Sequence, residues 1–548
     1  MILRRMPPFA FSFAFLCAAL MAVFACAAPT PQEPKPQDPE PKPPEAAKRE
    51  KAPDFPEKLD WLNTGGPLKM EDLKGKVVIL DFWTLCCINC IHILPDLAKL
   101  EKKWANELVV VGVHSAKFDS EKITKNIRKA VLRYEIAHPV VNDAEHGIWN
   151  KFGVNSWPTF IVLDTEGRVV GETSGEGNYE ILDKVVAKLV EEGKANKTLN
   201  EKPIRFDLAK FREKGDTPLF FPGKIAADEK ANRLVIADST HHRIVVSDLA
   251  GKLQTVIGTG TPGKQDGKFA EAQFDDPQGV VIDGDLIYIA DRKNHQLRVA
   301  DLKAGTVSTL AGNGEQDQRS RITDPDKPVK AMEVGLNSPW DLLKVGDTLF
   351  IAMAGHHQIW SMDLKAKTIA PYAGDGRERL QDGPVYAASF AQPSGLTTDG
   401  KYIYVADCEI SSIRRVPLDP KGRVETLIGE GLFEFGDKDG VFPEARIQHA
   451  LAVLEHEGRL IVADTYNSKL KILDPKTKQI KSWLGDNDPN AKDPIFNEPA
   501  GLAKAGGKLY VADTNSHRIR VVDLKTNAIS TLEIQGLQPP PPPKEAKK

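Results

Sequence analysis

The first folded part of the chain alternates short apolar runs with stretches whose apolar residues recur every three or four positions. Short apolar runs are typical of buried strands, and the longer spacing is typical of helices with one buried face. The expected strands are residues 77–83, 108–114, 140–142 and 160–164, with a fifth at 168–172 after a turn sequence. The expected helices are residues 88–104, 121–134, 144–152 and 179–192. Strands and helices in this order predict an α/β domain, which we assign to residues 57–198.

The rest of the chain repeats one pattern, in which an apolar strand ends in Ala-Asp. The six copies are residues 236–238, 289–291, 351–353, 405–407, 462–464 and 511–513, and the third ends in Met353 instead of aspartate. Successive copies start 53, 62, 54, 57 and 49 residues apart, which suits propeller blades and is long for a solenoid. A four-stranded unit of this kind must stack on neighbours to bury both faces. Residues 205–535 are therefore expected to form an all-β, six-bladed propeller.

Composition narrows the function classes. The chain has 548 residues, 41% of them hydrophobic and 27% charged, which is ordinary for a soluble protein of two or three domains. A formal net charge of −3 argues against nucleic-acid binding through bulk charge. Six cysteines are too few for a disulfide-stapled scaffold, so we expect their roles to be chemical rather than structural.

The N-terminal residues have the pattern of an export signal, with two arginines before an apolar segment at residues 9–25. The sequence Val-Phe-Ala-Cys that ends at Cys26 resembles a lipobox, which implies a lipid on Cys26. Cleavage near Ala28 without a lipid is the alternative. Residues 1–28 are thus the expected leader, and the membrane is expected to be reached only through a lipid anchor.

Proline, lysine and glutamate dominate residues 29–56, which have almost no large apolar side chains. Such a segment cannot build a core and tends to form an extended tether. Residues 536–548 have a similar composition and are expected to be a disordered tail. Together these segments predict an exported protein, periplasmic or on the cell surface, whose folded domains follow a stalk.

The sequence places a Cys-x-x-Cys pair, Cys87 and Cys90, where the strand at 77–83 leads into the helix at 88–104. Free N–H groups and the positive end of the helix dipole stabilise a thiolate at such a junction. Cys90 follows one helical turn later and is close enough to form a disulfide with Cys87. We expect Cys87, at the exposed end, to attack a partner, and Cys90 to resolve the mixed disulfide.

Residues around this pair resemble the thioredoxin superfamily. Asp81, Phe82 and Trp83 match its Asp-Phe-Trp sequence, and the sequence Trp157-Pro158-Thr159 stands where the superfamily has its active-site proline loop. The resemblance implies that Asp81 is a buried carboxylate that moves protons at the resolving cysteine. It also implies a cis peptide bond before Pro158, with this loop and Trp157 facing the cysteines. The extra helix and strand before the loop are similar to exported thioredoxin-like reductases.

Two departures leave questions open. Cys86 replaces the tryptophan that usually precedes the first cysteine, and Ile88-Asn89 replaces the common Gly-Pro. The dipeptide between the cysteines tunes the reduction potential, so the direction of the redox reaction is undecided. Cys86 and Cys87 are adjacent and could pair with each other, which leaves a role for Cys86 open.

Metal sites and other cofactors are disfavoured. A zinc site lacks the second ligand pair, and a c-type haem site would need a histidine where Ile91 follows Cys90. A copper site of Cys86 and Cys90 with a distant histidine, His138 or His146, is a remaining alternative. A peroxiredoxin would need a lone cysteine in a pattern that is absent. We expect no metal and no cofactor, and we expect the histidines of the domain, including His114, to be surface or core residues.

The residues after the Ala-Asp strands resemble the NHL repeat, as at residues 294–297 (Asn-His-Gln-Leu) and 517–519 (His-Arg-Ile). Aspartate and histidine recur four positions apart in three blades, at residues 238 and 242, 291 and 295, and 513 and 517. Catalytic acid–base pairs and hydrogen bonds that fix each turn are the two interpretations, and the recurrence favours the hydrogen bonds. NHL propellers usually bind proteins, peptides or RNA. Without a basic face or interleaved aromatic residues, we expect a protein or peptide and no nucleic acid.

The two resemblances together imply an exported thiol–disulfide oxidoreductase that acts on protein thiols or disulfides through a Cys87–Cys90 disulfide. The propeller would then bind the partner. A non-enzymatic propeller scaffold with a vestigial thioredoxin module is the alternative. The linker at residues 195–203 is short, so the propeller could also pack over the cysteines and form part of their site.

Overall fold

The computed structural model describes residues 49–208, 216–318, 327–486 and 493–541. The expected leader, Cys26 and most of the expected stalk lie outside these ranges. None of the helices within them has the length and hydrophobicity that a membrane span requires.

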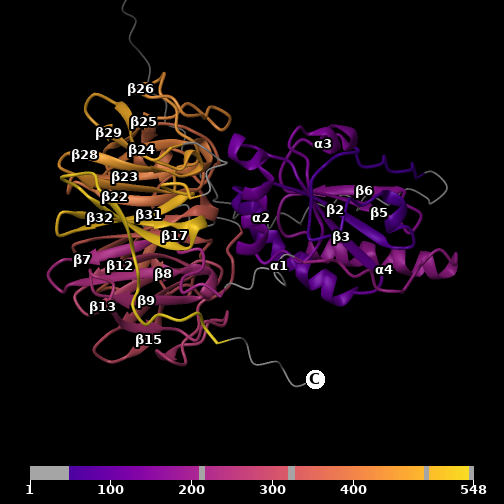
Figure 1. Ribbon diagram of the computed structural model, residues 1–548, viewed down its shortest axis with the longest axis horizontal. Coiled ribbons are helices and arrows are strands. Elements are labelled where there is room, and N and C mark those ends of the chain that lie inside the picture. The colour runs from indigo at the N-terminus through magenta and orange to yellow at the C-terminus, as the bar shows by residue number, and fades with distance from the viewer. Residues whose placement is uncertain (1–48, 209–215, 319–326, 487–492, 542–548) are drawn as a thin grey trace, which may run out of the picture. The chain divides into compact units, whose positions relative to one another are not determined.

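A six-stranded sheet in the order β1-β4-β3-β2-β5-β6 forms the centre of the first domain (Figure 1). Its strands are β1 (Trp61–Leu62), β2 (Val77–Trp83), β3 (Leu108–His114), β4 (Val140–Asn142), β5 (Thr159–Leu163) and β6 (Val169–Ser174). The helices are α1 (Ile88–Lys103), α2 (Thr124–Arg133), α3 (Gly147–Phe152) and α4 (Tyr179–Ala195). Strand β2 runs parallel to β3 and antiparallel to β5. This is the predicted α/β thioredoxin-like arrangement.

Strand β2 is buried along its whole length because helices cover both faces of the sheet. Val77 and Ile79 pack with α1 and α4, whereas Val78 and Leu80 pack with α3 on the other face. Figure 1 shows α3 and α4 on opposite sides of the sheet. Side chains alternate between the faces of a strand, so Asp81 follows Val77 and Ile79 toward the face that α1 covers.

Two predicted helices begin later than expected: α3 begins at Gly147 instead of residue 144, and α2 at Thr124 instead of residue 121. Instead of a continuous helix from residue 121, the chain forms a 3₁₀ turn (Asp119–Lys122), an extended residue at Ile123, and then α2. The carboxylate of Glu121 accepts backbone N–H bonds from Lys117 and Phe118, which holds the turn apart from α2. Residue spacing alone does not reveal a side chain that binds its own backbone in this way.

The second domain is a six-bladed β-propeller, as predicted (Figure 1). Blades one to three are β7 (Ile225–Asp228), β8 (Arg233–Asp238), β9 (Arg243–Ser247) and β10 (Leu253–Ile257); β11 (Gly267–Lys268), β12 (Pro277–Asp283), β13 (Leu286–Asp291), β14 (Gln296–Asp301) and β15 (Thr306–Ala311); and β16 (Val329–Lys330), β17 (Pro339–Val345), β18 (Thr348–Met353), β19 (Gln358–Asp363) and β20 (Thr368–Ala373). Blades four to six are β21 (Gly383–Pro384), β22 (Pro393–Thr398), β23 (Tyr402–Asp407), β24 (Ser412–Pro417) and β25 (Arg423–Ile428); β26 (Gly440–Val441), β27 (Ala452–His456), β28 (Arg459–Asp464), β29 (Lys469–Asp474) and β30 (Gln479–Leu484); and β31 (Pro499–Ala505), β32 (Lys508–Asp513), β33 (Arg518–Asp523) and β34 (Ile529–Leu532).

Glycines after the inner-strand prolines let neighbouring blades approach closely. A Cβ atom on Gly395 would lie 2.7 Å from the carbonyl oxygen of Leu451 in the next blade. A Cβ atom on Gly501 would lie 2.5 Å from the carbonyl oxygen of Gly223, which joins the last blade to the first. The Pro-x-Gly sequences therefore mark the places where inner strands of adjacent blades meet.

Hydrogen bonds between adjacent blades explain the recurring histidines. The repeated strand is followed by a short 3₁₀ turn in five blades and by another tight turn in the second. Each turn ends in a residue in the left-handed conformation, whose side chain accepts a backbone N–H bond from the next blade at 3.1–3.4 Å. These acceptors are His242, His295, His357, Ser411, Ser468 and His517. The donors, which also have positive φ angles and which we call the junction residues, are Asp276, Ser338, Gln392, His449, Glu498 and Phe221.

The aspartates bind a different N–H group. Asp291, for example, accepts the N–H of Asp275 at 2.8 Å, whereas His242 of the preceding blade accepts the N–H of Asp276 at 3.2 Å. Two consecutive N–H groups of each loop are thus held, one from its own blade and one from the blade before. The recurring pair fixes turns, as the repetition indicated, but its members bind separate loops. Serine oxygens serve in the two blades without the histidine.

The exception at Met353 also has a physical cause. In three blades the aspartate pairs with a buried cation seven residues later, as Asp291 does with Arg298 at 2.8 Å. In the third blade this position is Trp360, and both Met353 and Trp360 are fully buried. The Met353 sulfur accepts the N–H that a carboxylate accepts elsewhere. Replacing both members of a buried ion pair with apolar residues avoids leaving one charge unpaired.

We therefore expect Met353→Asp to lower the free energy of unfolding by about 3–5 kcal/mol, because the new carboxylate would be buried beside Trp360 without a cation. Denaturant unfolding of the full chain measures this effect. Adding Trp360→Arg should recover part of the loss. Met353→Leu is the matched control and should cost less than about 1.5 kcal/mol. Equal stability of the Asp and Leu variants would contradict this account of the third blade.

Candidate functional site

The predicted cysteine pair lies where β2 leads into α1. Cys87 is the residue that precedes the first turn of α1, and Ile88 is the first helical residue. Cys86, Cys87 and Cys90 are free thiols in this structure, as is Cys408 of the propeller. The structure therefore presents Cys87 and Cys90 as a dithiol, and their disulfide stays a prediction.

Cys87 is covered by the propeller. It is 8% exposed, against 2% for Cys86 and 0% for Cys90, so the expectation that it lies at an exposed end is wrong. Phe221 and Tyr466 of the propeller belong to the same apolar cluster as the three cysteines. The sequence pattern describes the thioredoxin-like domain alone, in which this end of α1 would face solvent.

Gln392 makes the most direct contact between the propeller and the cysteine loop. Its side-chain oxygen accepts the backbone N–H of Ile88 at 2.9 Å, and its amide nitrogen donates to the backbone oxygen of Cys86 at 3.0 Å. The peptide groups on both sides of Cys87 are thus bound by one propeller side chain. Cys87 precedes the helix, and a side chain at this position binds the N–H groups of the second or third helical residue. Gln392 binds the N–H group of the first, Ile88, and so does not compete for them.

Other junction residues contact the thioredoxin-like domain from equivalent places in their blades. These contacts join Ser338 to His92 (2.6 Å), Glu498 to Arg133 (3.7 Å), the ring of Phe221 to the Arg133 guanidinium (5.1 Å) and the ring of His449 to that of Phe118 (5.3 Å). Sequence analysis missed these residues. Most of them directly precede the proline of an inner strand, and this was the signal that could have identified them.

Cys86 lies among carboxylates. Its N–H donates to Glu121 at 3.0 Å, and its thiol lies 3.7 Å from a side-chain oxygen of Glu409 in the propeller. Glu409 also pairs with Lys117 at 2.6 Å, and both side chains of this ion pair are 4% exposed. Burial raises the pKa of Cys86 well above its usual value, and the charges of Glu121 and Glu409 raise it further. Cys86 is therefore held as a protonated thiol.

Cys90 is held in its protonated form as well. Burial raises the pKa of Cys90 well above its usual value, and the hydrogen bond to Cys87 and the charge of Cys87 add to this rise. The charge of Asp81 raises it too, which makes Asp81 an electrostatic neighbour of Cys90. A thiol that keeps its proton needs a base before it can act as a nucleophile.

Asp81 has the surroundings of such a base. It is fully buried, and neither of its carboxylate oxygens has a hydrogen-bond partner within the described part of the chain. Burial raises the pKa of Asp81 to about 7, with His138 opposing the rise and Glu101 adding to it. A carboxylate that titrates near neutrality can both accept and release a proton under ordinary conditions.

The remaining predicted residues gather near the cysteines. The peptide bond between Trp157 and Pro158 is cis, and both Trp157 and Trp83 pack with the cysteine cluster. The expected core histidine His114 is fully buried, and it accepts the N–H of Leu85 at 3.3 Å. No group of three or more metal-binding side chains is arranged around a metal position among the residues that the structure covers.

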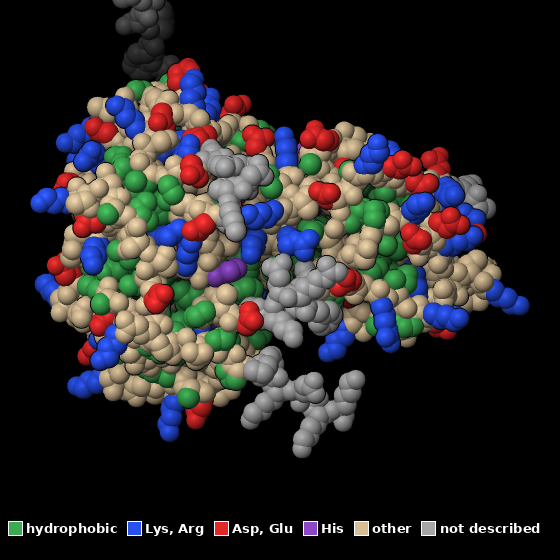
Figure 2. Space-filling view, in the orientation of Figure 1, with side chains coloured by type: hydrophobic (Ala, Val, Ile, Leu, Met, Phe, Trp, Pro, Cys, Tyr) green, Lys and Arg blue, Asp and Glu red, His purple; other side chains and the backbone are tan. Residues whose placement is uncertain are grey.

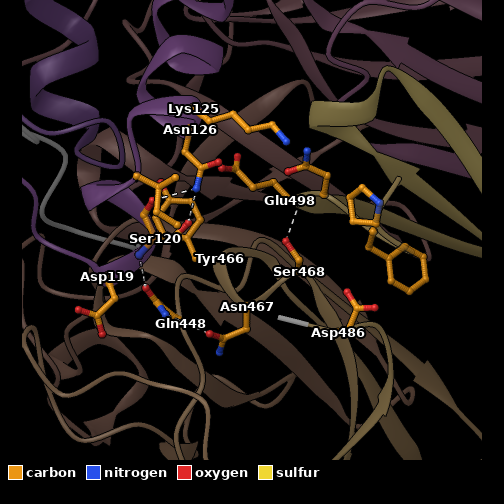
Figure 3. A pocket seen from close by; sticks show the side chains of 14 residues that line it. Asp119, Ser120, Lys125, Asn126, Gln448, Tyr466, Asn467, Ser468, Asp486 and Glu498 are labelled. Carbon is orange, nitrogen blue, oxygen red and sulfur yellow. Dashed lines mark hydrogen bonds between the residues drawn. The ribbon is translucent and has the colours of Figure 1, made fainter. Parts of the chain in front are cut away.

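Two pockets lie at the boundary of the domains. The one in Figure 3 has a volume of about 230 Å³ and is lined by Ser120 and Asn126 on one side and by Gln448 and Glu498 on the other. Tyr466 also lines it and belongs to the cysteine cluster, so this pocket approaches the site from solvent. The other, of about 570 Å³, lies between α1 and the propeller.

The buried state of Asp81 predicts a pH-dependent stability. Its pKa is about 7 when folded, whereas a free aspartate titrates near pH 4. Folding therefore keeps a proton on Asp81, and the contribution of Asp81 to stability is lost as pH rises from about 4 to about 7. This loss is up to about 4 kcal/mol, since each pKa unit is worth about 1.4 kcal/mol.

Asp81→Asn should escape this loss because asparagine does not ionise. Its free energy of unfolding, relative to wild type, should be up to about 4 kcal/mol higher near pH 8 than near pH 4. Urea denaturation at the two pH values measures the difference. Asp143→Asn is the control. The Asp143 carboxylate accepts N–H bonds from Ile148 and Trp149, so replacing it should destabilise the fold instead of relieving a buried charge. No change with pH in Asp81→Asn relative to wild type would contradict the assignment.

The comparisons with known proteins agree with this architecture. A thioredoxin-like family model matches residues 75–169, and the NHL repeat model matches residues 274–300 and 496–522. The chain is 45% identical over 516 residues to Protein SUPPRESSOR OF QUENCHING 1, chloroplastic, of Arabidopsis thaliana, covering 89% of this chain and 48% of that protein. It is 44% identical over 490 residues to NHL repeat-containing protein 2 of Bos taurus, covering 82% of this chain and 66% of that protein.

A smaller relative matches the first domain alone. Thiol-disulfide oxidoreductase YkuV of Bacillus subtilis is 25% identical over 145 residues, which are 26% of this chain and 97% of that protein. The chain spans 48% and 66% of the two longer relatives, which therefore extend beyond it. The predicted resemblance is confirmed: the chain is a thioredoxin-like domain followed by an NHL-repeat β-propeller, and it is related to NHL repeat-containing protein 2 and SUPPRESSOR OF QUENCHING 1 over most of its length.

Proposed function

We propose that the protein is a thiol–disulfide oxidoreductase whose reactive pair is Cys87 and Cys90. A thioredoxin-like domain with these relatives supports a redox module. The observation that carries the finer proposal is the buried, unpartnered carboxylate of Asp81, which has a pKa of about 7 and whose charge raises the pKa of the resolving thiol. A smaller relative of the first domain has a name that describes the same reaction.

The exchange begins when the Cys87 thiolate attacks one sulfur of a partner disulfide. The partner's sulfur–sulfur bond breaks, its other sulfur leaves as a thiolate, and a mixed disulfide forms on Cys87. Cys90 then gives its proton to Asp81 and attacks the Cys87 sulfur, which releases the partner's second sulfur. The partner gains two electrons and the Cys87–Cys90 disulfide forms. The reverse sequence oxidises a partner dithiol, and which direction prevails depends on the reduction potential.

We propose further that the propeller forms part of this site and does not only bind the partner at a distance. Gln392 binds both sides of Cys87, and Glu409 lies beside Cys86. Because Cys87 is 8% exposed, the partner would present its cysteine on an extended segment rather than on a folded surface. Figure 2 shows basic and acidic side chains interspersed on one face of the protein, which suits a protein partner better than a nucleic acid.

The burial of Cys87 beneath the propeller also favours a second candidate function, that of a non-catalytic scaffold. In a non-catalytic scaffold the cysteines would be core residues of the domain boundary, and burial at this level is what such a role requires. Turnover of a disulfide or dithiol substrate by the full chain distinguishes the two candidates. Activity no higher than that of Cys87→Ser would favour the scaffold.

The cellular address is a separate proposal. We propose that the protein is exported and held at the membrane by a lipid on Cys26, because residues 1–28 have the pattern of a lipoprotein leader. Mass spectrometry of the mature N-terminus tests this directly, since a lipid on Cys26 and a plain terminus near Ala28 differ in mass. An intact leader in the mature protein would refute export.

Removing the resolving thiol should trap partners. In the full chain, Cys90→Ser should accumulate mixed disulfides on Cys87, because the second step then lacks its nucleophile. Mass spectrometry of the trapped adducts identifies the cysteine that carries them. Adding Cys86→Ser should leave trapping unchanged, whereas adding Cys87→Ser should abolish it. Adducts on Cys86 would overturn the assignment of the attacking residue.

Charge at Gln392 should change the reactivity of Cys87. Gln392→Glu should slow alkylation of Cys87 near pH 7 by about tenfold, because a carboxylate at this position repels the thiolate that reacts. Gln392→Ala, the matched control, removes the same contacts without adding charge and should speed alkylation by uncovering Cys87. Alkylation followed by mass spectrometry measures both rates. Changes in the same direction would mean that charge at this position does not act on Cys87.

A further inference from the structure

Four polar atoms without a partner belong to three neighbouring side chains around Asp81. They are both carboxylate oxygens of Asp81, the ring N–H of Trp83 and the Nε2 atom of His138, none of which has a hydrogen-bond partner among residues 49–208, 216–318, 327–486 and 493–541. All three side chains are at most 3% exposed. Buried polar groups are normally bonded, so four such atoms in one place call for an explanation.

These side chains can approach one another because Gly112 has no side chain of its own. Gly112 stands opposite Asp81 in the pairing of β2 with β3. A Cβ atom on Gly112 would lie 3.0 Å from the Trp83 ring nitrogen and 3.4 Å from His138 Nε2. Both nitrogen atoms therefore lie over Gly112, on the face of the sheet that Asp81 shares, and an added side chain would crowd them. A polar space with several partners of this kind is where proteins hold buried water.

His138 continues from this space toward solvent. Its Nδ1 atom lies 3.4 Å from both carboxylate oxygens of Glu101 on α1. The side chain of Glu101 is 24% exposed, and Glu101 and His138 both line the cavity of about 570 Å³ between α1 and the propeller. Asp81, His138 and Glu101 therefore form a series that leads from the fully buried interior to a cavity.

The charges along this series suit proton exchange near neutrality. Burial opposes a charge on His138, but Glu101 and Asp81 more than offset this, so the pKa of His138 is raised above its usual value. Glu101 on α1 and Asp81 on β2 are the charged groups that act on it. The pKa of Asp81 is about 7. A carboxylate that titrates near neutrality and an imidazole whose pKa that carboxylate helps to raise are suited to exchange a proton.

Cys90 and Asp81 are both 0% exposed, so a proton taken from Cys90 has no direct way to solvent. We propose that His138 and Glu101 carry this proton from Asp81 to the cavity, through a water molecule held beside Gly112. This inference rests on the proposed exchange reaction. His138 and Glu101 are positioning and relay residues, since neither touches the reacting sulfur atoms.

The proton balance is simple. The Cys90 thiol gives its proton to the Asp81 carboxylate and becomes the thiolate that attacks Cys87. Asp81 passes the proton to the water, the water gives a proton to Nε2 of His138, and Nδ1 of His138 gives one to Glu101. Glu101 releases it to solvent in the cavity. No electrons move along this path, and reduction of the Cys87–Cys90 disulfide uses it in the opposite direction.

The aromatic disulfide dithiobis(nitrobenzoate) reports attack by Cys87 and resolution by Cys90 as two separate steps. In the full chain with Cys86→Ser, attack by Cys87 releases one coloured thiolate, and resolution by Cys90 releases a second. His138→Gln and Glu101→Gln should leave the first phase unchanged and slow the second by about tenfold near pH 7. The defect should shrink near pH 9, because more hydroxide is then available to take up the proton whenever the site opens to solvent. His92→Gln is the control at a histidine that binds Ser338 and lies outside the series.

The outcomes separate this inference from the function on which it rests. Unchanged second phases and unchanged pH profiles in both variants would overturn the relay while leaving the exchange reaction intact. Equal slowing of both phases, or loss of the pH dependence together with lower unfolding temperature, would indicate a structural role and would also overturn it. A wild type that releases no second thiolate beyond that of Cys90→Ser would instead refute the proposed exchange itself.

Discussion

The hydrogen bonds of Gln392 to the peptide groups on both sides of Cys87 are the contact on which the site depends. Gln392 is held in turn, because its own N–H donates to His357 of the preceding blade at 3.1 Å. The interaction that joins blade to blade therefore also sets where this side chain stands. Closure of the propeller and the geometry of the cysteine loop are therefore coupled. The backbone of Gln392 joins two blades, and its side chain binds the peptide groups beside Cys87.

The buried ion pair of Lys117 and Glu409 adds specificity to this docking rather than much net stability. Taking two charges out of water costs about as much as their attraction returns, whereas leaving either one unpaired is strongly unfavourable. Any other arrangement of the domains would leave these charges, or the peptide groups beside Cys87, without partners. The polar contacts therefore favour one arrangement, and the apolar contacts of Phe221 and Tyr466 supply buried area.

Sequence reasoning succeeded where the determining signal is local. The strand before Cys87, the helix after it and the six repeats follow from apolar spacing within short windows, and Asp81 follows from its place in a motif. The contact of Gln392 with Ile88 joins residues 304 positions apart, and no local pattern encodes it. Cys87 was expected to be exposed because the propeller residues that cover it are distant in the sequence. The exception at Met353 is explained only by the structure, in which Met353 and Trp360 belong to the same buried cluster.

Three carboxylates near the cysteines differ in what their surroundings let them do. Glu121 accepts bonds from Thr84, Cys86, Lys117 and Phe118, and losing its charge would weaken all of them.

Glu409 is held as an anion: burial acts to raise its pKa, but Lys117, His449 and its hydrogen bonds together lower it. Asp81 has neither a cation at bonding distance nor a bonded donor among the residues described. Burial is the main influence on it and raises its pKa to about 7. Environments that separate the pKa values of like groups also separate their roles. Of the three, Asp81 is the carboxylate that can gain and lose a proton without breaking the structure around it, and it is the one beside Cys90.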